Sequence, residues 1–177
     1  TSPTFTEDAS AQTLFSGAAV SVVEAGQAIK SLTFTVSGLQ NGSAEQISVD
    51  GSLISLANGT GTTTTNGMTY TVSVVSGTAT IVLDKAAGVS TANVASLINS
   101  MTYQNTSQDP TAGNRVVTLT QIKDTGGVAN GGVDTTAVSI ASTVAVNAVN
   151  DAPILSATAT SPTFTEDASA QTLFSGA

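Results

Sequence analysis

Apolar and polar residues alternate with a period of two over much of this chain. In residues 29–36, Leu32, Phe34 and Val36 fall on one face, and small polar residues fall on the other. Successive side chains of a β-strand point to opposite faces of a sheet, so the pattern predicts a half-buried strand. The same alternation predicts further strands in residues 46–49, 53–56, 68–74, 79–83, 101–104, 116–122 and 133–149.

Turn residues separate the predicted strands of the first half of the chain. They are Gly38 to Gly42, Asp50-Gly51, Asn58-Gly59, Asn66-Gly67 and Ser76-Gly77. Gly, Asn and Asp tolerate the backbone conformations of tight hairpin turns, so we expect neighbouring strands to pair as hairpins. Short strands at such intervals are typical of an all-β fold, here an antiparallel β-sandwich.

One segment follows the helical period instead. Val94, Leu97, Ile98 and Met101 stand at i, i+3, i+4 and i+7, after Ser90 or Thr91 as N-cap. This pattern predicts one short helix at about residues 90–100. We expect its apolar stripe to cover an open end or edge of the sandwich; a groove for a partner is the alternative use.

The first eighteen residues of the chain return unchanged as residues 160–177, an offset of 160 − 1 = 159. Such identity does not arise by chance, and it indicates a tandem array whose units touch mainly their neighbours. We predict a sandwich repeat in residues 1–149, a linker in 150–159, and the first strand of the next repeat in 160–177, here called the tail. Pro153 restricts Ala152 to extended geometry, so the linker should leave the sandwich straight.

The tail lacks the other strands of its own sandwich. Phe164, Leu173 and Phe174 should therefore be partly exposed. We hypothesise that the tail docks on another molecule or on its own domain, where it would compete with the identical residues 1–18.

Composition removes several classes of function. The chain has no Cys and no His, so disulfides, thiolate metal sites and the usual Ser or Cys hydrolase triads cannot form. Four Lys and Arg against twelve Asp and Glu give a net charge of −8, which repels nucleic acid and anionic membranes and favours cations. No apolar stretch approaches the roughly 20 residues of a bilayer span.

Asp124-Thr125-Gly126 matches the catalytic triplet of aspartic proteases. That chemistry needs two such carboxylates at close range, and one period holds a single triplet, although a symmetric dimer could supply the second. Lys123 stands where those enzymes have apolar strand residues. A turn after a strand explains the same spacing, and we predict that the chain is not an enzyme.

Oxygen ligands are the plentiful functional groups, and Ca²⁺ binds six to eight hard oxygens in irregular geometry. Asp8 adjoins Glu7 near the first strand. The candidate calcium ligands from the sequence are Glu7, Glu24, Asp124, Asn150 and Asp151. Each could equally be a solvated residue at a strand end or turn, but for Asp151, beside Asn150 and Pro153, we favour the ligand.

Four segments of the chain together form a recognisable pattern. They are Phe5-Thr6-Glu7-Asp8, Met101 to Ser107 followed by Asp109-Pro110, the strand from Thr118 to Gly127, and Val146 to Pro153. In this order and spacing they resemble the cadherin-like repeats of giant bacterial adhesins, many of them repeats-in-toxin (RTX) proteins exported by type I secretion. The resemblance implies an Ig-like β-sandwich, calcium at the junctions between repeats, and an extracellular role at the bacterial cell surface in adhesion or biofilm formation.

The resemblance also implies which residues bind calcium. Glu7 and its copy Glu166 resemble the glutamate of the first cadherin strand, and Asn150 with Asp151 resembles the Asn-Asp pair of the Asp-x-Asn-Asp-Asn-x-Pro linker. This chain departs from the pattern because Asn147 replaces the first Asp of that linker and Val149 replaces an oxygen ligand. Val22 and Glu24 likewise stand where related repeats carry Asp-x-Asp. We therefore expect weaker or fewer calcium sites than in a complete cadherin junction, down to none.

Together these observations predict a non-enzymatic extender module of a long extracellular adhesin, with calcium as an optional stiffener of its joints. Its partners would be neighbouring repeats of the same chain. Two alternatives remain open. A module that binds a glycan or a protein is one, although two Tyr and no Trp leave little for sugar stacking. A self-associating surface-layer or filament module, assembling through sheet edges and the 160–177 tail, is the other.

Overall fold

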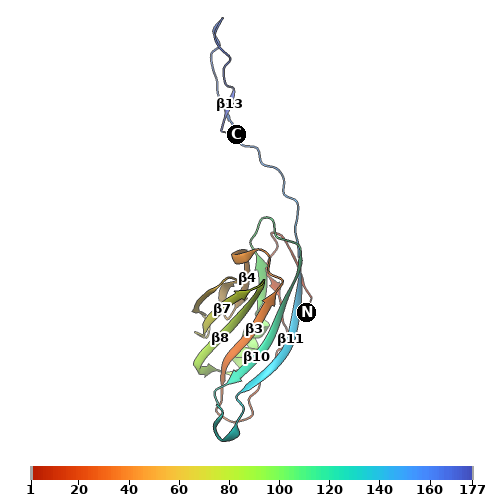
Figure 1. The fold of residues 1–177 in the computed structure, drawn as a ribbon, viewed down its shortest axis with the longest axis vertical. Helices are drawn as coiled ribbons and strands as arrows, with labels where there is room; N and C mark the ends of the chain where they lie inside the picture. Colours follow the sequence, from red (N-terminus) through yellow and green to blue (C-terminus); the bar gives the residue numbers. More distant parts are fainter. Residues whose placement is uncertain (1, 177) are drawn as a thin grey trace.

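Two β-sheets form a sandwich in the computed structural model, which describes residues 2–176, and a connector and a small hairpin follow (Figure 1). The larger sheet has the strand order β1-β11-β10-β3-β8-β7-β6. Its strands are β1 (Thr4–Thr6), β3 (Ile29–Ser37), β6 (Gly59–Thr62), β7 (Thr69–Val75), β8 (Thr78–Val89), β10 (Gly113–Asp124) and β11 (Thr135–Asn147).

The smaller sheet has the order β2-β9-β4-β5. Its strands are β2 (Gln12–Thr13), β4 (Glu45–Val49), β5 (Ser52–Ser55) and β9 (Thr102–Asn105). Short 3₁₀ turns, η1 (Gly42–Ala44) and η2 (Ala129–Gly131), lie in loops. The all-β fold class and the sandwich are confirmed, and within the described residues every strand pair of the two sheets is antiparallel except one, β1 with β11.

Three of the five predicted turn segments form hairpins, at Asp50-Gly51, Asn66-Gly67 and Ser76-Gly77. Gly38 to Gly42 and Asn58-Gly59 instead join strands of different sheets, β3 to β4 and β5 to β6, so the hairpin prediction is wrong there. Asp50 and Gly51 have φ of 52° and 74° between β4 and β5, and Ser76 and Gly77 have φ of 49° and 71° between β7 and β8. Two residues with positive φ make the turn whose twist matches that of the flanking strands. The strand β6 was not predicted, because its Gly-Thr-Gly-Thr sequence has no apolar alternation.

The inward side chains of both sheets and the helix form one core. The core includes the alternating residues Leu32, Phe34 and Val36 of β3, all buried. The helix α1 (Thr91–Asn99) is confirmed: the Ser90 hydroxyl accepts a hydrogen bond from the N–H of Asn93, and Val94, Leu97 and Ile98 are buried. Because α1 joins β8 of the larger sheet to β9 of the smaller one, its apolar stripe closes the sandwich between the two layers.

The chain leaves the sandwich after β11 as a connector without regular structure, residues 148–157. A two-pair hairpin of β12 (Thr158–Ala159) and β13 (Phe174–Ser175) follows, well away from the sandwich (Figure 1). All residues from 147 to 176 are exposed. The hypothesis that the tail docks on its own domain is therefore wrong for this structure, and docking on another molecule stays a hypothesis. No helix in residues 2–176 is long and apolar enough to cross a membrane.

Candidate functional site

The end of the sandwich from which the connector leaves holds the first and last strands side by side. β1 pairs in parallel with the last residues of β11, Thr4 with Ala145 and Thr6 with Asn147. The N–H of Ala145 donates to the carbonyl of Pro3, and the N–H of Glu7 donates to the carbonyl of Asn147, both at 3.0 Å. Residues 1–18 were predicted to supply one strand, but they supply β1 to one sheet and β2 to the other.

Glu7 fastens the start of the connector to this end. Its side chain is 6% exposed, and its Oε2 accepts a hydrogen bond of 2.7 Å from the N–H of Val149. Its Oε1 is buried and has no hydrogen-bond partner within residues 2–176. A buried carboxylate oxygen without a partner is costly, and a bound cation would satisfy it. Glu7 is therefore the predicted ligand whose surroundings fit a cation best.

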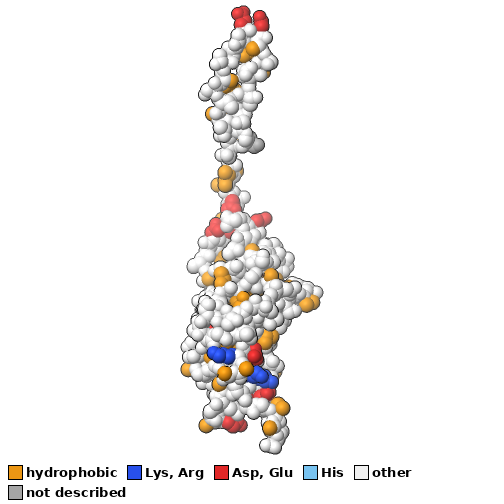
Figure 2. All heavy atoms as spheres, turned by 90° about the vertical axis from the view of Figure 1, so that its left-hand side faces the viewer, with side chains coloured by type: hydrophobic (Ala, Val, Ile, Leu, Met, Phe, Trp, Pro, Cys, Tyr) orange, Lys and Arg blue, Asp and Glu red, His pale blue; other side chains and the backbone are white. Residues whose placement is uncertain are grey.

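Other oxygen donors lie at the same end but are more exposed. Asp8 accepts a hydrogen bond of 3.0 Å from the side chain of Gln108, and the Asn150 amide donates to the backbone carbonyl of Asp151. Asn150 and Asp151 are both exposed. Acidic side chains gather where the connector leaves the sandwich (Figure 2). Across residues 2–176, however, no three His, Cys, Asp or Glu side chains are grouped closely enough to hold a metal ion, so the fit to calcium is partial.

The remaining predicted ligands lie elsewhere. Asp124 ends β10 beside Ile29, and its carboxylate accepts a 2.7 Å hydrogen bond from the N–H of Gly126, which closes the turn. Glu24 is exposed in the turn before β3. The N–H of Thr125 donates to the carbonyl of Ala28, so this turn and Asp124 lie at the same end of the sandwich, opposite the connector. Glu166 is exposed in the tail. The structure therefore does not bring the six predicted ligands into one site.

A buried ionic network that was not predicted from the sequence links the two layers. Glu45 of β4 is 0% exposed and Arg115 of β10 is 1% exposed, and Arg115 Nε lies 2.5 Å from Glu45 Oε1. The Tyr103 hydroxyl donates to the same oxygen at 2.8 Å, and the N–H groups of Gln40 and Asn41 donate to Oε2. Burial, together with the charge of Glu45, raises the pKa of Tyr103. The network fixes the spacing of the sheets near the connector.

The sequence did carry a signal for this network. Arg115 has the same parity as Val117 and Leu119, and Glu45 has the same parity as Ile47 and Val49, so strand alternation places both charges on inward faces. A charge at an inward position needs an opposite charge beside it. Asp50, 2% exposed, was also missed; it accepts hydrogen bonds from the Thr63 hydroxyl and from the backbone and side-chain N–H groups of Asn66.

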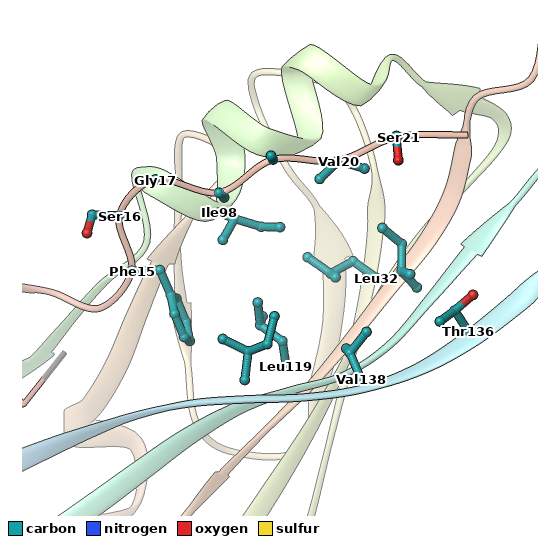
Figure 3. A pocket seen from close by; sticks show the side chains of 14 residues that line it. Phe15, Ser16, Gly17, Val20, Ser21, Leu32, Ile98, Leu119, Thr136 and Val138 are labelled. Atoms are coloured by element: carbon teal, nitrogen blue, oxygen red, sulfur yellow. The ribbon is translucent and has the colours of Figure 1, made fainter. Parts of the chain in front are cut away.

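An apolar cavity of roughly 520 Å³ opens between the segment 15–21, α1 and the larger sheet. The side chains of Phe15, Ile98, Leu119 and Val138 converge on it (Figure 3). Its polar lining consists of hydroxyls, such as that of Thr136, and no charged side chain lines it. The cavity suits the burial of an apolar side chain rather than acid–base chemistry.

Comparison with protein-family models, with curated proteins and with solved structures found no match for the chain. The fold, the connector end and the cavity are therefore the basis on which a function is proposed.

Proposed function

We propose that the chain is a structural repeat unit of a long extracellular bacterial adhesin, an Ig-like and cadherin-like sandwich whose task is to extend the protein from the cell surface. Catalysis has no part in this proposal. The observation that carries it is the eighteen-residue sequence that occurs once inside the sandwich and once beyond the connector.

The two copies have opposite environments. In the first copy Phe5 is 1% exposed, whereas its counterpart Phe164 is 64% exposed. Leu14 and Leu173 differ in the same way, at 0% and 61%. A sequence whose apolar side chains are buried only inside a complete sandwich is expected to begin another sandwich when it recurs. Units joined in this way form a line, and extension follows from their number.

Small-angle scattering of a chain with two full periods tests the extension role. We expect a maximum dimension close to twice that of one unit, because each unit should touch its neighbour only near the connector. A two-period chain whose units pack side by side would contradict the proposal. A single-period chain measured in the same buffer is the control.

We propose further that calcium stiffens the joint at Glu7, which is supported by the buried, unpartnered Glu7 Oε1. Asn150 and Asp151 would add oxygens from the connector, at positions that this structure leaves exposed. A cation bound only by the folded form raises the melting temperature by mass action. We expect a higher melting temperature in millimolar calcium than in chelator, and we expect Glu7→Gln to abolish the difference while Glu24→Gln, in an exposed turn, preserves it. No difference in the unmodified chain would remove calcium and leave extension in place.

Two other functions remain candidates. Self-association through a sheet edge is one, because no strand of the described chain pairs with the outer side of β11 over residues 135–141. Binding of a glycan has less support, because the cavity is apolar and its one aromatic lining residue is Phe15. A specific hit on a glycan array would favour it.

A further inference from the structure

One edge of β11 lies open beside the apolar cavity. β1 pairs only with the last three residues of β11, and no strand of the described chain pairs with this side of β11 over residues 135–141. Thr136 and Val138 face the cavity from this stretch (Figure 3). Ile140 also lines the cavity and is 55% exposed, although its partner on β10, Leu119, is 4% exposed. Unpaired backbone groups and uncovered apolar side chains are therefore adjacent, which is the arrangement that accepts an added strand.

The direction of β1 identifies the segment that can cover this edge. β1 runs parallel to β11, so a strand that leads into Thr4 would run along β11 from residue 135 towards Ala145. In the second copy of the repeated sequence the counterpart of Thr4 is Thr163, and the chain that leads into it is residues 154–162. In strand geometry this segment spans about 30 Å, which covers β11 from about residue 136 up to the position where β1 pairs.

The side chains at the start of this segment suit such a strand. Residues 154–159 read Ile-Leu-Ser-Ala-Thr-Ala, without charge or Pro. Ile154 and Leu155 are 95% and 90% exposed. The register of β11 against β10 shifts between Ala137 and Ile140, and a strand on the other side of β11 can follow this shift or ignore it. Because Ile154 and Leu155 are consecutive, one of them faces the cavity in either case.

We propose that residues 154–159 form a β-strand on the open edge of β11 in the unit that follows them, and that Ile154 or Leu155 fills the cavity of that unit. The inference rests on the proposed extension role, because it requires a following unit. The new strand continues directly into the β1 of that unit. Pro162 does not prevent this, because the carbonyl of its counterpart Pro3 already accepts a hydrogen bond from the N–H of Ala145.

The hairpin of β12 and β13 does not oppose this strand in a complete unit. It holds Thr158 and Ala159 by two residue pairs only, and a hairpin of this size is marginally stable. Its other strand contains Phe174, whose counterpart Phe15 is 6% exposed and lines the cavity. A complete unit that buries Phe174 in the same way withdraws it from Ala159, and residues 158–159 become free to pair with β11.

The strand also sets the direction of the array. The β11 of one unit, the connector and the β11 of the next unit would all run the same way, so the units follow each other end to end. The free part of the connector shortens to residues 148–153, which span roughly 20 Å at most. A short free segment between two sheets restricts bending, and this restriction does not require calcium.

Amide hydrogen exchange on an extended chain tests the strand. The extended chain carries the sequence of residues 154–159 directly before Thr1 of the full 177-residue protein, as an array would place it. We expect exchange in residues 135–141 to be at least about tenfold slower than in the unmodified protein, as expected when one large aliphatic side chain is buried with the strand. The melting temperature should rise as well. Unchanged exchange in residues 135–141 would overturn the proposal.

Matched variants test whether an apolar side chain fills the cavity. An added segment of the same length with Asp in place of its Ile and Leu should lose most of the protection, because a carboxylate is costly to bury there. Ile140→Ser should remove most of the rise in melting temperature that the added segment causes. Val75→Ser, at an exposed position of β7, is the control and should preserve that rise. Equal protection by the Asp-bearing segment, or equal effects of the two substitutions, would overturn the proposal.

Sedimentation and scattering separate the remaining outcomes. The unmodified protein should stay monomeric as its concentration rises; oligomers that protect residues 135–141 would assign the edge to a second copy and overturn the proposal. An elongated two-period chain, together with an added segment that gives no protection, would overturn the strand and leave the extension role standing. A two-period chain whose units pack side by side would overturn both.

Discussion

Identical substitutions at Phe5 and Phe164 provide a comparison that the repeated sequence makes possible. Both phenylalanines stand in the same eighteen-residue sequence, so local propensity and composition are the same for both. Phe5 is buried, and its ring meets that of Tyr103 edge to face, with centroids 5.8 Å apart and planes at 88°. Phe164 is mostly exposed. Any difference in the effect of Phe→Ala therefore measures the surroundings of the side chain alone.

We expect Phe5→Ala to lower the free energy of unfolding by about 3–5 kcal/mol, the usual range for a buried Phe→Ala change. About 0.5–1.5 kcal/mol of this loss is attributed to the edge-to-face pair with Tyr103. With a urea m-value of about 2 kcal/mol/M, the midpoint should fall by about 1.5–2.5 M. Phe164→Ala should leave the midpoint unchanged.

Urea unfolding followed by far-ultraviolet circular dichroism is the assay, with the unmodified chain and both variants at the same protein concentration. A loss below about 1 kcal/mol for Phe5→Ala would refute the burial argument, because it would mean that the first strand is not part of the cooperative core. Similar losses in both variants would instead show that the two copies alternate in one position on the sandwich.

The two ion pairs within residues 2–176 should respond differently to removal of their cations. Arg115→Met leaves Glu45 buried without its partner and should lower the free energy of unfolding in urea by about 3–5 kcal/mol. Lys123→Met removes the cation of a partly exposed pair with Asp134 and should lower it far less. Equal losses of unfolding free energy would contradict the assigned burial. The hydrogen bond from the Thr135 hydroxyl, followed by that from Lys123, lowers the pKa of Asp134 from its ordinary 3.8. Because the folded pKa lies below the unfolded one, this carboxylate stabilises the fold above the unfolded value, and the contribution is lost as the pH falls through the folded pKa. Asp134→Asn should therefore lower the melting temperature at about pH 6 but not at about pH 2, and a decrease of the same size at both would contradict the assignment.

The larger part of the sandwich follows from period-two alternation, because alternating residues such as Phe34 share one face of a strand and are buried where that face packs against the other layer. The helix was likewise predictable from the spacing of Val94, Leu97 and Ile98. The positions of β1 and β2, including the parallel pairing of β1 with β11, were not predictable. These strands have three and two residues, which are too few positions to show a period. Their placement is decided by distant partners, as the contrast between Phe5 and Phe164 shows.

The candidate site was less predictable than the fold. Glu7 was selected as an acidic residue near the first strand and again through the resemblance, and whether it binds calcium stays a prediction. Glu24 and Asp124 were selected as acidic residues near turns, a pattern that says nothing about which turns meet. The Glu45–Arg115 pair could have been found by asking which inward strand positions carry charge, a question that hydrophobic patterning alone does not raise.

The parallel pairing of β1 with β11 determines how the sandwich responds when its two ends are pulled apart. Tension would draw β1 toward its N-terminal end and β11 toward its C-terminal end, in opposite directions along a shared axis. The hydrogen bonds from Pro3–Ala145 to Glu7–Asn147 would then be sheared together instead of opening one after another. The bond between Glu7 Oε2 and the N–H of Val149 lies beyond them, at the point where the force enters.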